Sequence, residues 1–269
     1  MNSGICIHSA VPVRREPAHT SEMVTQILFG ELYRIVDKEN NWLRIHLIYD
    51  DYEGWIHLLQ SHSVSESEFI RLAGSETAVT LDLVHPLSHE NLQPLFPILA
   101  GSSLPGIAQQ RLQIDQEVFF FDGKIFSASQ PAQTDDSLNL QKIRQDIMND
   151  AMIFINAPYL WGGRTPFGID CSGFTQLVYK LQKIKLLRDA IQQSTQGEVI
   201  SLLAEAEPGD LAFFDDEEGK ITHVGLVIDH SKIIHCSGKV RIDALDHEGI
   251  YDRELQRYTH KLRLIKRIL

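Results

Sequence analysis

Residues 159–174 read YLWGGRTPFGIDCSGF, and they place one cysteine, Cys171, where a glycine-rich loop leads into a helix. The apolar residues that follow have the spacing of one helix face: Phe174, Leu177, Val178 and Leu181. Cys171 therefore falls in the first turn, where unpaired backbone N–H groups and the positive end of the helix dipole stabilise a thiolate. The sequence predicts a nucleophilic cysteine with a lowered pKa.

A histidine base for this cysteine is predicted in the segment THVGLVID, residues 222–229. Its apolar residues alternate, as is typical of a strand, and His223 stands at the start. A second apolar run, KIIHCSG at residues 232–238, follows after a link short enough for a hairpin. Antiparallel pairing of these strands brings His223 close to His235. A cysteine, a histidine base and a polar residue that orients the base form a nucleophilic catalytic site.

Four motifs in order make residues 138–269 resemble the NlpC-type family of papain-like cysteine peptidases, which cut bacterial cell-wall peptides. The motifs are DCSGF at 170–174, EPGDLAFF at 207–214, HVG at 223–225 and IHCSG at 234–238. The resemblance implies an α+β papain-like domain whose nucleophile helix packs on a small antiparallel sheet. It assigns Cys171 as nucleophile, His223 as base and His235 as the orienting residue. The sequence pattern predicts helices at 139–156 and 171–182, with strands near 210–215, 223–229, 232–236 and 261–269.

The other cysteines and histidines are interpreted as structural. Cys6 has no motif around it, and Cys236 follows His235 in a strand, where successive side chains point to opposite faces. The twelve histidines show no metal-ligand spacing. His89-Glu90 begins like a zinc-peptidase motif, but Gln93 stands where the second histidine is needed. We therefore expect no metal and no cofactor.

The composition limits the partners of the chain. It has 269 residues, 43% of them hydrophobic, and a formal charge of −11, which argues against nucleic acid or an anionic membrane as the main partner. A small peptide that is cationic or zwitterionic is compatible, and the oligomeric state is left open. Three cysteines do not suggest a disulfide framework.

Neither a membrane span nor a secretory signal is predicted from the sequence. No apolar run approaches the roughly 20 residues of a membrane span. The first residues, Met1 to His8, lack the basic start and apolar core of a secretory signal. We therefore expect a cytoplasmic protein, unless an export signal was trimmed away.

The region before the catalytic domain is expected to be all-β. Residues 1–62 resemble a bacterial SH3 domain, with short strands at 23–29, 32–36, 42–45 and 53–56 between polar turns. Residues 63–137 are interpreted as a second, diverged SH3-like domain with a linker at 127–137 and strands at 77–83, 118–121 and 124–126. The expected fold class is thus small SH3-like barrels followed by an α+β papain-like domain.

The whole layout resembles γ-D-glutamyl-L-diamino acid endopeptidases. The resemblance implies cleavage after the D-Glu of L-Ala-γ-D-Glu peptides, before L-Lys or meso-diaminopimelate, with a free L-Ala amine required. It also implies a substrate-binding set, consisting of Asp170, Ser172, Tyr52, Glu16 and Trp161. Such an activity belongs to peptidoglycan turnover or recycling.

These binding residues have simpler alternatives. Asp170 is also a good helix N-cap, and Glu16 and Tyr52 lie in predicted turns where a surface role is the default. Trp161 is interpreted as packing beside the cleft. Ala190 and Ile191 stand where the family often has a small hydroxyl residue near the substrate, so this side of the specificity pocket departs from the family pattern.

Two alternative functions stay open on sequence grounds. An amidase or acyltransferase on the same scaffold would use the same nucleophile and base. A non-catalytic cell-wall-binding protein is suggested by the SH3-like modules, although it leaves Cys171, His223 and His235 unexplained. Thiol alkylation separates the classes, because an enzyme is expected to show one fast-reacting cysteine and a binding module none.

Overall fold

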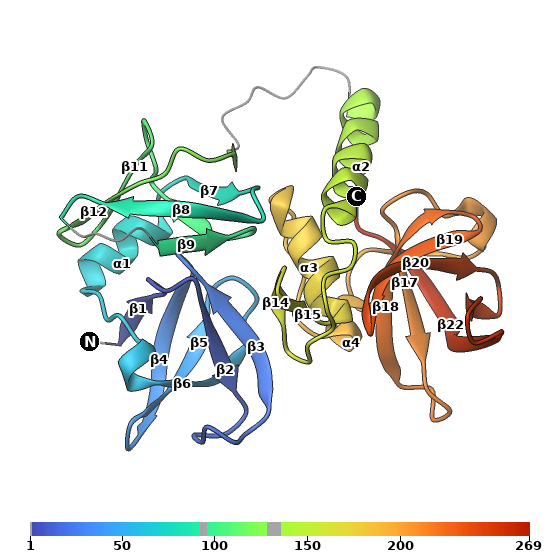
Figure 1. The fold of residues 1–269 in the computed structure, drawn as a ribbon, viewed down its shortest axis with the longest axis horizontal. Helices are drawn as coiled ribbons and strands as arrows, with labels where there is room; N and C mark the ends of the chain where they lie inside the picture. The colour runs from blue at the N-terminus through green and yellow to red at the C-terminus, as the bar shows by residue number, and fades with distance from the viewer. Residues whose placement is uncertain (1, 92–95, 128–135) are drawn as a thin grey trace. The chain divides into compact units, whose positions relative to one another are not determined.

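The computed structural model describes residues 2–91, 96–127 and 136–269 (Figure 1). The chain divides into two compact units, Met1–Pro131 and Ala132–Leu269. The finer predicted division of the first unit at residue 62 stays a prediction, and most of the predicted linker, 128–135, lies outside the described residues. Within the described ranges, no helix combines the length and the apolar character that a membrane span needs.

The first unit begins with a six-stranded antiparallel sheet in the order β1-β4-β5-β6-β2-β3. Its strands are β1 (Ser3–Ile5), β2 (Ala10–Arg14), β3 (Met23–Leu28), β4 (Leu32–Glu39), β5 (Trp42–Leu47) and β6 (Glu53–His57), and the 3-10 turn η1 (Leu58–Gln60) follows. Alternate apolar residues, such as Val11, Val13 and Ile45, are buried in one core. This is the SH3-like region expected from the alternating strands and polar turns.

In the rest of the first unit, the described residues form one helix and two small sheets. The helix α1 (Glu66–Ala73) begins after Ser65, whose side chain accepts a hydrogen bond from the Glu68 amide. The sheets have the orders β10-β7-β13 and β11-β12-β8-β9. Their strands are β7 (Thr77–Thr80), β8 (Val84–His89), β9 (Phe96–Leu99), β10 (Ser103–Pro105), β11 (Arg111–Ile114), β12 (Glu117–Phe120) and β13 (Ile125–Phe126).

The sequence prediction for this part was incomplete. It anticipated β7, β12 and β13 but not α1, because the short pattern of Glu66–Ala73 was read as part of an all-β region. Ile5 on β1 and Phe29, directly after β3, are buried in one cluster with Leu72 and Phe121. The two parts of this unit therefore share a core, and the assignment of residues 63–137 to a second SH3-like domain stays a prediction.

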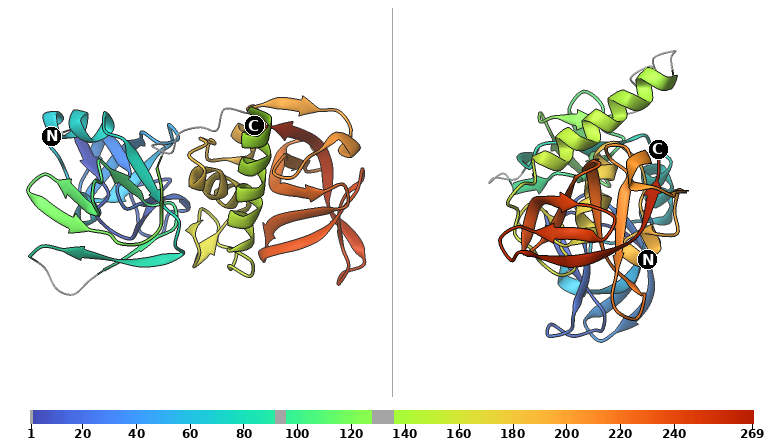
Figure 2. Two further views of the ribbon diagram at one scale, coloured as in Figure 1. Left: turned by 90° about the horizontal axis from the view of Figure 1, so that it is seen from above. Right: turned by 90° about the vertical axis from the view of Figure 1, so that its right-hand side faces the viewer.

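The second unit combines helices with a closed antiparallel barrel. Helices α2 (Asp136–Met152) and α3 (Cys171–Leu181) lie on one side of the barrel (Figures 1 and 2), and the short α4 (Ala190–Gln193) follows α3. The strand order is β16-β22-β17-β18-β19-β20-β21, and β21 also pairs with β22. The added pairing closes a ring of six strands, with β16 outside the ring.

Two neighbouring strands of this ring carry His223 and His235. The strands of this seven-stranded sheet are β16 (Glu198–Ile200), β17 (Leu211–Asp215), β18 (Ile221–Asp229), β19 (Lys232–Ser237), β20 (Lys239–Leu245), β21 (Gly249–Asp252) and β22 (Arg257–Arg267), with the 3-10 turn η2 (Leu203–Glu205) before β17. The antiparallel sheet was expected, but β20 and β21 were not predicted, and β21 completes the closure by pairing with β22.

A buried turn fixes α3 against the start of β17. The phenol of Tyr179 on α3 donates to the Gly209 carbonyl oxygen at 2.6 Å. The Asp210 carboxylate is buried and accepts from Arg144 Nη1 at 3.1 Å and from Arg267 Nη2 at 2.8 Å. These contacts join α2, α3 and β22 to the EPGD turn, which explains why that motif accompanies the nucleophile helix.

Candidate active site

Cys171 is held at the first residue of α3 by the turn before it. A short hairpin, β14 (Arg164–Thr165) with β15 (Gly168–Ile169), leads directly into the helix. Asp170 caps the helix, and its Oδ1 accepts from the Gly173 amide at 2.6 Å. Every residue of α3 is buried, so the cap fixes Cys171 against the barrel.

The Cys171 thiol is neutral in this structure. Its residue is 8% exposed, and burial raises the pKa of the thiol to about 12, with the Asp170 charge acting in the same direction. The N–H groups of Val224 and Ser172 lower the pKa by less. The expected lowered pKa is therefore wrong for this state, because burial outweighs the helix terminus. A neutral thiol becomes a nucleophile only when a base removes its proton.

His223 is placed to be that base. It precedes Val224, whose N–H is a hydrogen-bond partner of the Cys171 sulfur. Its Nε2 lies 2.8 Å from Nδ1 of His235, and both rings are buried. Burial, and then the neighbouring His235 and His260, hold the pKa of His223 well below its usual value. A neutral imidazole therefore stands beside a neutral thiol, and the structure brings the three predicted catalytic residues together.

A carboxylate that the sequence analysis missed continues this chain. Asp243 on β20 places Oδ2 2.9 Å from His235 Nε2, and its side chain is 8% exposed. Burial acts to raise the pKa of Asp243, but hydrogen bonds from His235 and Arg241 outweigh it and lower the pKa. Arg241 also reaches Asp252 on β21, with Nη1 to Oδ2 at 3.2 Å. The signal was the alternation of Arg241 and Asp243 directly after the His235 strand.

His260 on β22 is a second residue that the sequence analysis missed. Its ring stacks on the His223 ring with centroids 4.1 Å apart and planes at 28°. Burial, and then the nearby His235, lower the pKa of His260 to about 4. The stack limits the tilt of the His223 ring. Because the pKa of His260 is lowered, this ring is neutral near pH 7 and adds no charge beside His223. Histidine at this position carried no motif in the sequence.

Asp170 is engaged by more than its helix. Arg188, which is 1% exposed, donates through Nη2 to Asp170 Oδ2 at 2.7 Å and through Nη1 to Ser172 Oγ at 2.9 Å. The Gly162 amide also donates to Oδ2, at 2.8 Å. The N-cap alternative is thus realised together with a buried ion pair. A role of Asp170 and Ser172 in substrate binding stays a prediction.

The other predicted binding residues lie in different surroundings. Trp161 is 60% exposed, and its packing beside the cleft stays a prediction. Tyr159, two residues before it, was quoted only as part of the motif, yet burial and the nearby Cys171 raise the pKa of its phenol, which is a neutral hydroxyl near the thiol. Glu16 is exposed and Tyr52 is half-buried in the first unit. Their assignment to an amine pocket stays a prediction.

The other two cysteines are buried and have no part in this arrangement. Cys236 is 0% exposed and donates to the Ile169 carbonyl at 3.1 Å, away from the neighbouring His235 ring. Cys6 is in the core of the first sheet, where burial raises the pKa of its thiol to about 12. Cys6, Cys171 and Cys236 are all free thiols.

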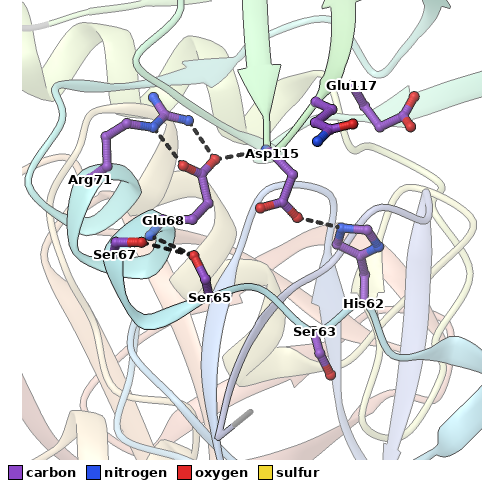
Figure 3. Close-up of a pocket in the computed structure, with 9 residues that line it drawn as sticks. His62, Ser63, Ser65, Ser67, Glu68, Arg71, Asp115 and Glu117 are labelled. Atoms are coloured by element: carbon purple, nitrogen blue, oxygen red, sulfur yellow. Dashed lines mark hydrogen bonds and ion pairs between the residues drawn. The ribbon is translucent and has the colours of Figure 1, made fainter.

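Each of the two units has an open pocket. One, of about 900 Å³, is lined by residues 215–217, 247–248 and 258–262, and it includes His260. The other, of about 700 Å³, lies in the first unit; there Arg71 pairs with Glu68 at 2.6 Å and His62 with Asp115 at 3.3 Å (Figure 3). Among the described residues that line this second pocket none is a cysteine, so it offers no thiol nucleophile.

Comparison with known proteins agrees with this geometry. Residues 156–259 match the model of the NlpC/P60 family, and residues 13–60 match the bacterial dipeptidyl-peptidase Sh3 domain. The chain carries an NlpC/P60 domain behind a bacterial SH3 domain. With Cys171 and His223 in place, this NlpC/P60 domain makes the protein a cysteine peptidase.

The sequence similarity to curated relatives extends over both units. The chain is 29% identical to the gamma-D-glutamyl-L-lysine dipeptidyl-peptidase of Bacillus subtilis (strain 168) over 257 residues. This alignment covers 86% of this chain and 78% of the relative. The chain is 26% identical to the protein of the same name from Bacillus cereus, over 81% of this chain and 68% of the relative.

Solved structures share the fold. An NlpC/P60 family protein from Bacillus cereus aligns with a TM-score of 0.81 and 20% identity over 99% of both chains. An NlpC/P60 endopeptidase from Photobacterium damselae subsp. piscicida aligns with a TM-score of 0.71 and 16% identity, over 97% of this chain and 70% of that one. At these identities the likeness concerns the fold alone.

Proposed function

We propose that the protein hydrolyses the bond between γ-D-Glu and an L-diamino acid, either L-Lys or meso-diaminopimelate, in cell-wall peptides with a free N-terminal L-Ala. The observation that carries the proposal is the buried set of Cys171, His223 and His235, with the two rings 2.8 Å apart, in a chain related over most of its length to γ-D-glutamyl-L-lysine dipeptidyl-peptidases. The negative charge of the chain is compatible with a substrate that carries ammonium groups.

The proposed mechanism uses these residues in two steps. His223 takes the Cys171 proton while the sulfur attacks the γ-carbonyl carbon of D-Glu, and N–H groups at the start of α3 stabilise the oxyanion. The C–N bond then breaks, and the leaving amine receives the proton from His223. In the second step His223 removes a proton from water, which attacks the thioester and releases L-Ala-γ-D-Glu while the thiol is restored.

A requirement for the free amine restricts the substrate to peptides already released from the glycan. This restriction fits a role in peptidoglycan recycling, and we propose a cytoplasmic location on that ground. A peptide of this size carries its own charges at both ends, so recognition of the ammonium and of the diamino acid side chain would fix its direction in the site.

Cleavage of L-Ala-γ-D-Glu-L-Lys and its diaminopimelate analogue, followed by mass spectrometry, tests the proposal. We expect L-Ala-γ-D-Glu and the free diamino acid as products. Cys171→Ala should lower kcat by at least about 10³-fold, since nucleophile and base act as a unit. Cys6→Ala is the matched control and should stay active. Cleavage at another bond, or full activity in Cys171→Ala, would overturn the proposal.

A further inference from the structure

We propose that Asp243 is a positioning residue that decides which nitrogen of His223 carries the proton, acting through His235. The proposal starts from an unbroken row of contacts: His223 Nε2 to His235 Nδ1 at 2.8 Å, then His235 Nε2 to Asp243 Oδ2 at 2.9 Å. Asp243 touches neither Cys171 nor the face of His223 that a substrate would approach. Its effect must therefore pass through the ring between them.

The direction of these hydrogen bonds follows from the chemistry of the carboxylate. An ionised carboxylate only accepts, so His235 must donate from Nε2. A neutral His235 then has a lone pair at Nδ1 and accepts from His223 Nε2–H. A neutral His223 with its proton on Nε2 has its lone pair at Nδ1. That nitrogen is then free to accept the Cys171 proton.

The opposite arrangement would disable the base. If His235 carried its proton on Nδ1, its Nε2 lone pair would face the Asp243 carboxylate, and His223 would have to accept at Nε2. His223 would then carry its proton on Nδ1, and its one lone pair, at Nε2, would face His235, so no lone pair would be available to the Cys171 proton. Asp243 therefore disfavours the unproductive pair of tautomers without contacting the reacting atoms.

Arg241 holds Asp243 ready for this role. Arg241 Nε donates to Oδ2 at 2.8 Å and Nη2 to Oδ1 at 2.8 Å, so both oxygens of Asp243 are occupied by donors. Arg241 is in turn paired with Asp252. The strand register explains the arrangement: His235 lies opposite Arg241, and Asp243 is its diagonal neighbour on β20. Two further rings face His235, those of His223 and His260.

The variant Asp243→Asn tests the proposal sharply, because asparagine keeps the shape of the aspartate side chain but has an NH2 group in place of one carboxylate oxygen. If the amide NH2 faces His235, it requires the unproductive tautomer; if it faces Arg241, two donors oppose each other. We expect kcat to fall about 10²- to 10³-fold with KM unchanged, since a wrong tautomer removes the base and not the binding contacts. Asp246→Asn is the matched control, because Asp246 accepts from Tyr258 and turn amides only.

The decisive readout is the tautomer itself, measured by 15N NMR of the histidine rings in the full chain without substrate. His223 and His235 signals are identified by their loss in His223→Gln and His235→Gln. We expect both rings to carry the proton on Nε2 in the parent and both to gain the Nδ1–H form in Asp243→Asn. A parent with Nδ1–H at His223 overturns the proposal even if the variant fails to fold. So does a fall in kcat with unchanged tautomers.

Only the kinetic part rests on the proposed function. If the parent does not cleave the γ-D-Glu peptide, the proposed substrate fails while the NMR measurement still judges Asp243. If cleavage occurs and the parent tautomers are wrong, the substrate stands and the role of Asp243 fails.

Discussion

The Cys171 thiol combines a nucleophile's position with a raised pKa. At a pKa of about 12, only a very small fraction is thiolate at neutral pH, so reaction with iodoacetamide should be slow near pH 7. We expect the rate at Cys171, measured by peptide mass spectrometry, to keep rising with pH up to about pH 10. A plateau reached by pH 7 would contradict the neutral thiol and restore the lowered pKa predicted from the helix terminus.

His260 should make stability depend on pH. The pKa of His260 falls from 6.5 to about 4 on folding, so its contribution is fully present above about pH 6.5 and is lost as the pH falls toward 4. His223, whose pKa is also lowered, acts in the same direction. Tm of the parent should therefore decrease over this interval, and less steeply in His260→Phe, which keeps the aromatic stack.

The control for this measurement is His230→Gln, at an exposed position in the β18–β19 turn. It should leave the slope of Tm against pH as in the parent. An unchanged slope in His260→Phe would show that His260 is not the titrating group.

At the residue scale, sequence reasoning found three side chains that lie together in the structure and missed two of their neighbours. Cys171, His223 and His235 stand in short motifs with a known spacing, so their proximity was predictable. Asp243 and His260 lie on β20 and β22, and no motif in the sequence marks either residue as a neighbour of His223 and His235. The pKa of Cys171 was predicted in the wrong direction because burial depends on the packing of α3 and not on its first turn.

At the scale of the elements, the position of His235 depends on a glycine opposite it on β18. Gly225 pairs with His235 in the strand register, and a Cβ at this position would lie 2.8 Å from the His235 Cβ. Gly225→Ala should displace His235, lower kcat by at least about tenfold and reduce the free energy of unfolding by about 1–3 kcal/mol. Kinetics and denaturant unfolding of the same preparation measure both effects.

Gly219→Ala is the control that separates displacement of His235 from a general loss of stability. Gly219 has a positive φ of 79°, so alanine is strained there, yet nothing lies within 4 Å of the added Cβ. This variant should lose stability and keep kcat. If Gly225→Ala keeps full activity, His235 does not need its observed position.

The strands and helices of the second unit were largely predictable, whereas their closure was not. Alternation located β17, β18 and β19, and the helical spacing located α3. The sequence Lys239–Leu245 alternates too, but polar and charged residues occupy one of its faces. That face carries the Arg241 and Asp243 side chains toward His235, so the interior of the barrel is partly polar and the usual apolar signal of a strand is weakened.

At the scale of the whole molecule, we expect the first unit to contribute to substrate specificity. We expect Glu16 and Tyr52 to hold the L-Ala ammonium of the substrate. Acetylation of that amine removes its charge and should lower kcat/KM by about 10²-fold or more. Glu16→Ala and Tyr52→Ala should lower kcat/KM mainly for the free-amine peptide. The ratio of kcat/KM between the free and the acetylated peptide should therefore become smaller.

Glu39→Ala, at an exposed position on β4, is the control and should leave this ratio unchanged. Equal cleavage of L-Ala-γ-D-Glu-L-Lys and its N-acetyl form by the parent would show that no amine pocket exists. Peptides still attached to the glycan would then have to be included among the substrates.

The central claim is that Cys171 forms the covalent intermediate with the γ-carbonyl of D-Glu. An affinity label tests it most directly: an L-Ala-γ-D-Glu chloromethyl ketone, in which the electrophile replaces the scissile bond, with the labelled site mapped by peptide mass spectrometry. We predict a single adduct on Cys171, and its formation should depend on His223. An adduct on Cys6 or Cys236, or peptide cleavage by a protein that the reagent leaves unlabelled at Cys171, would contradict the account.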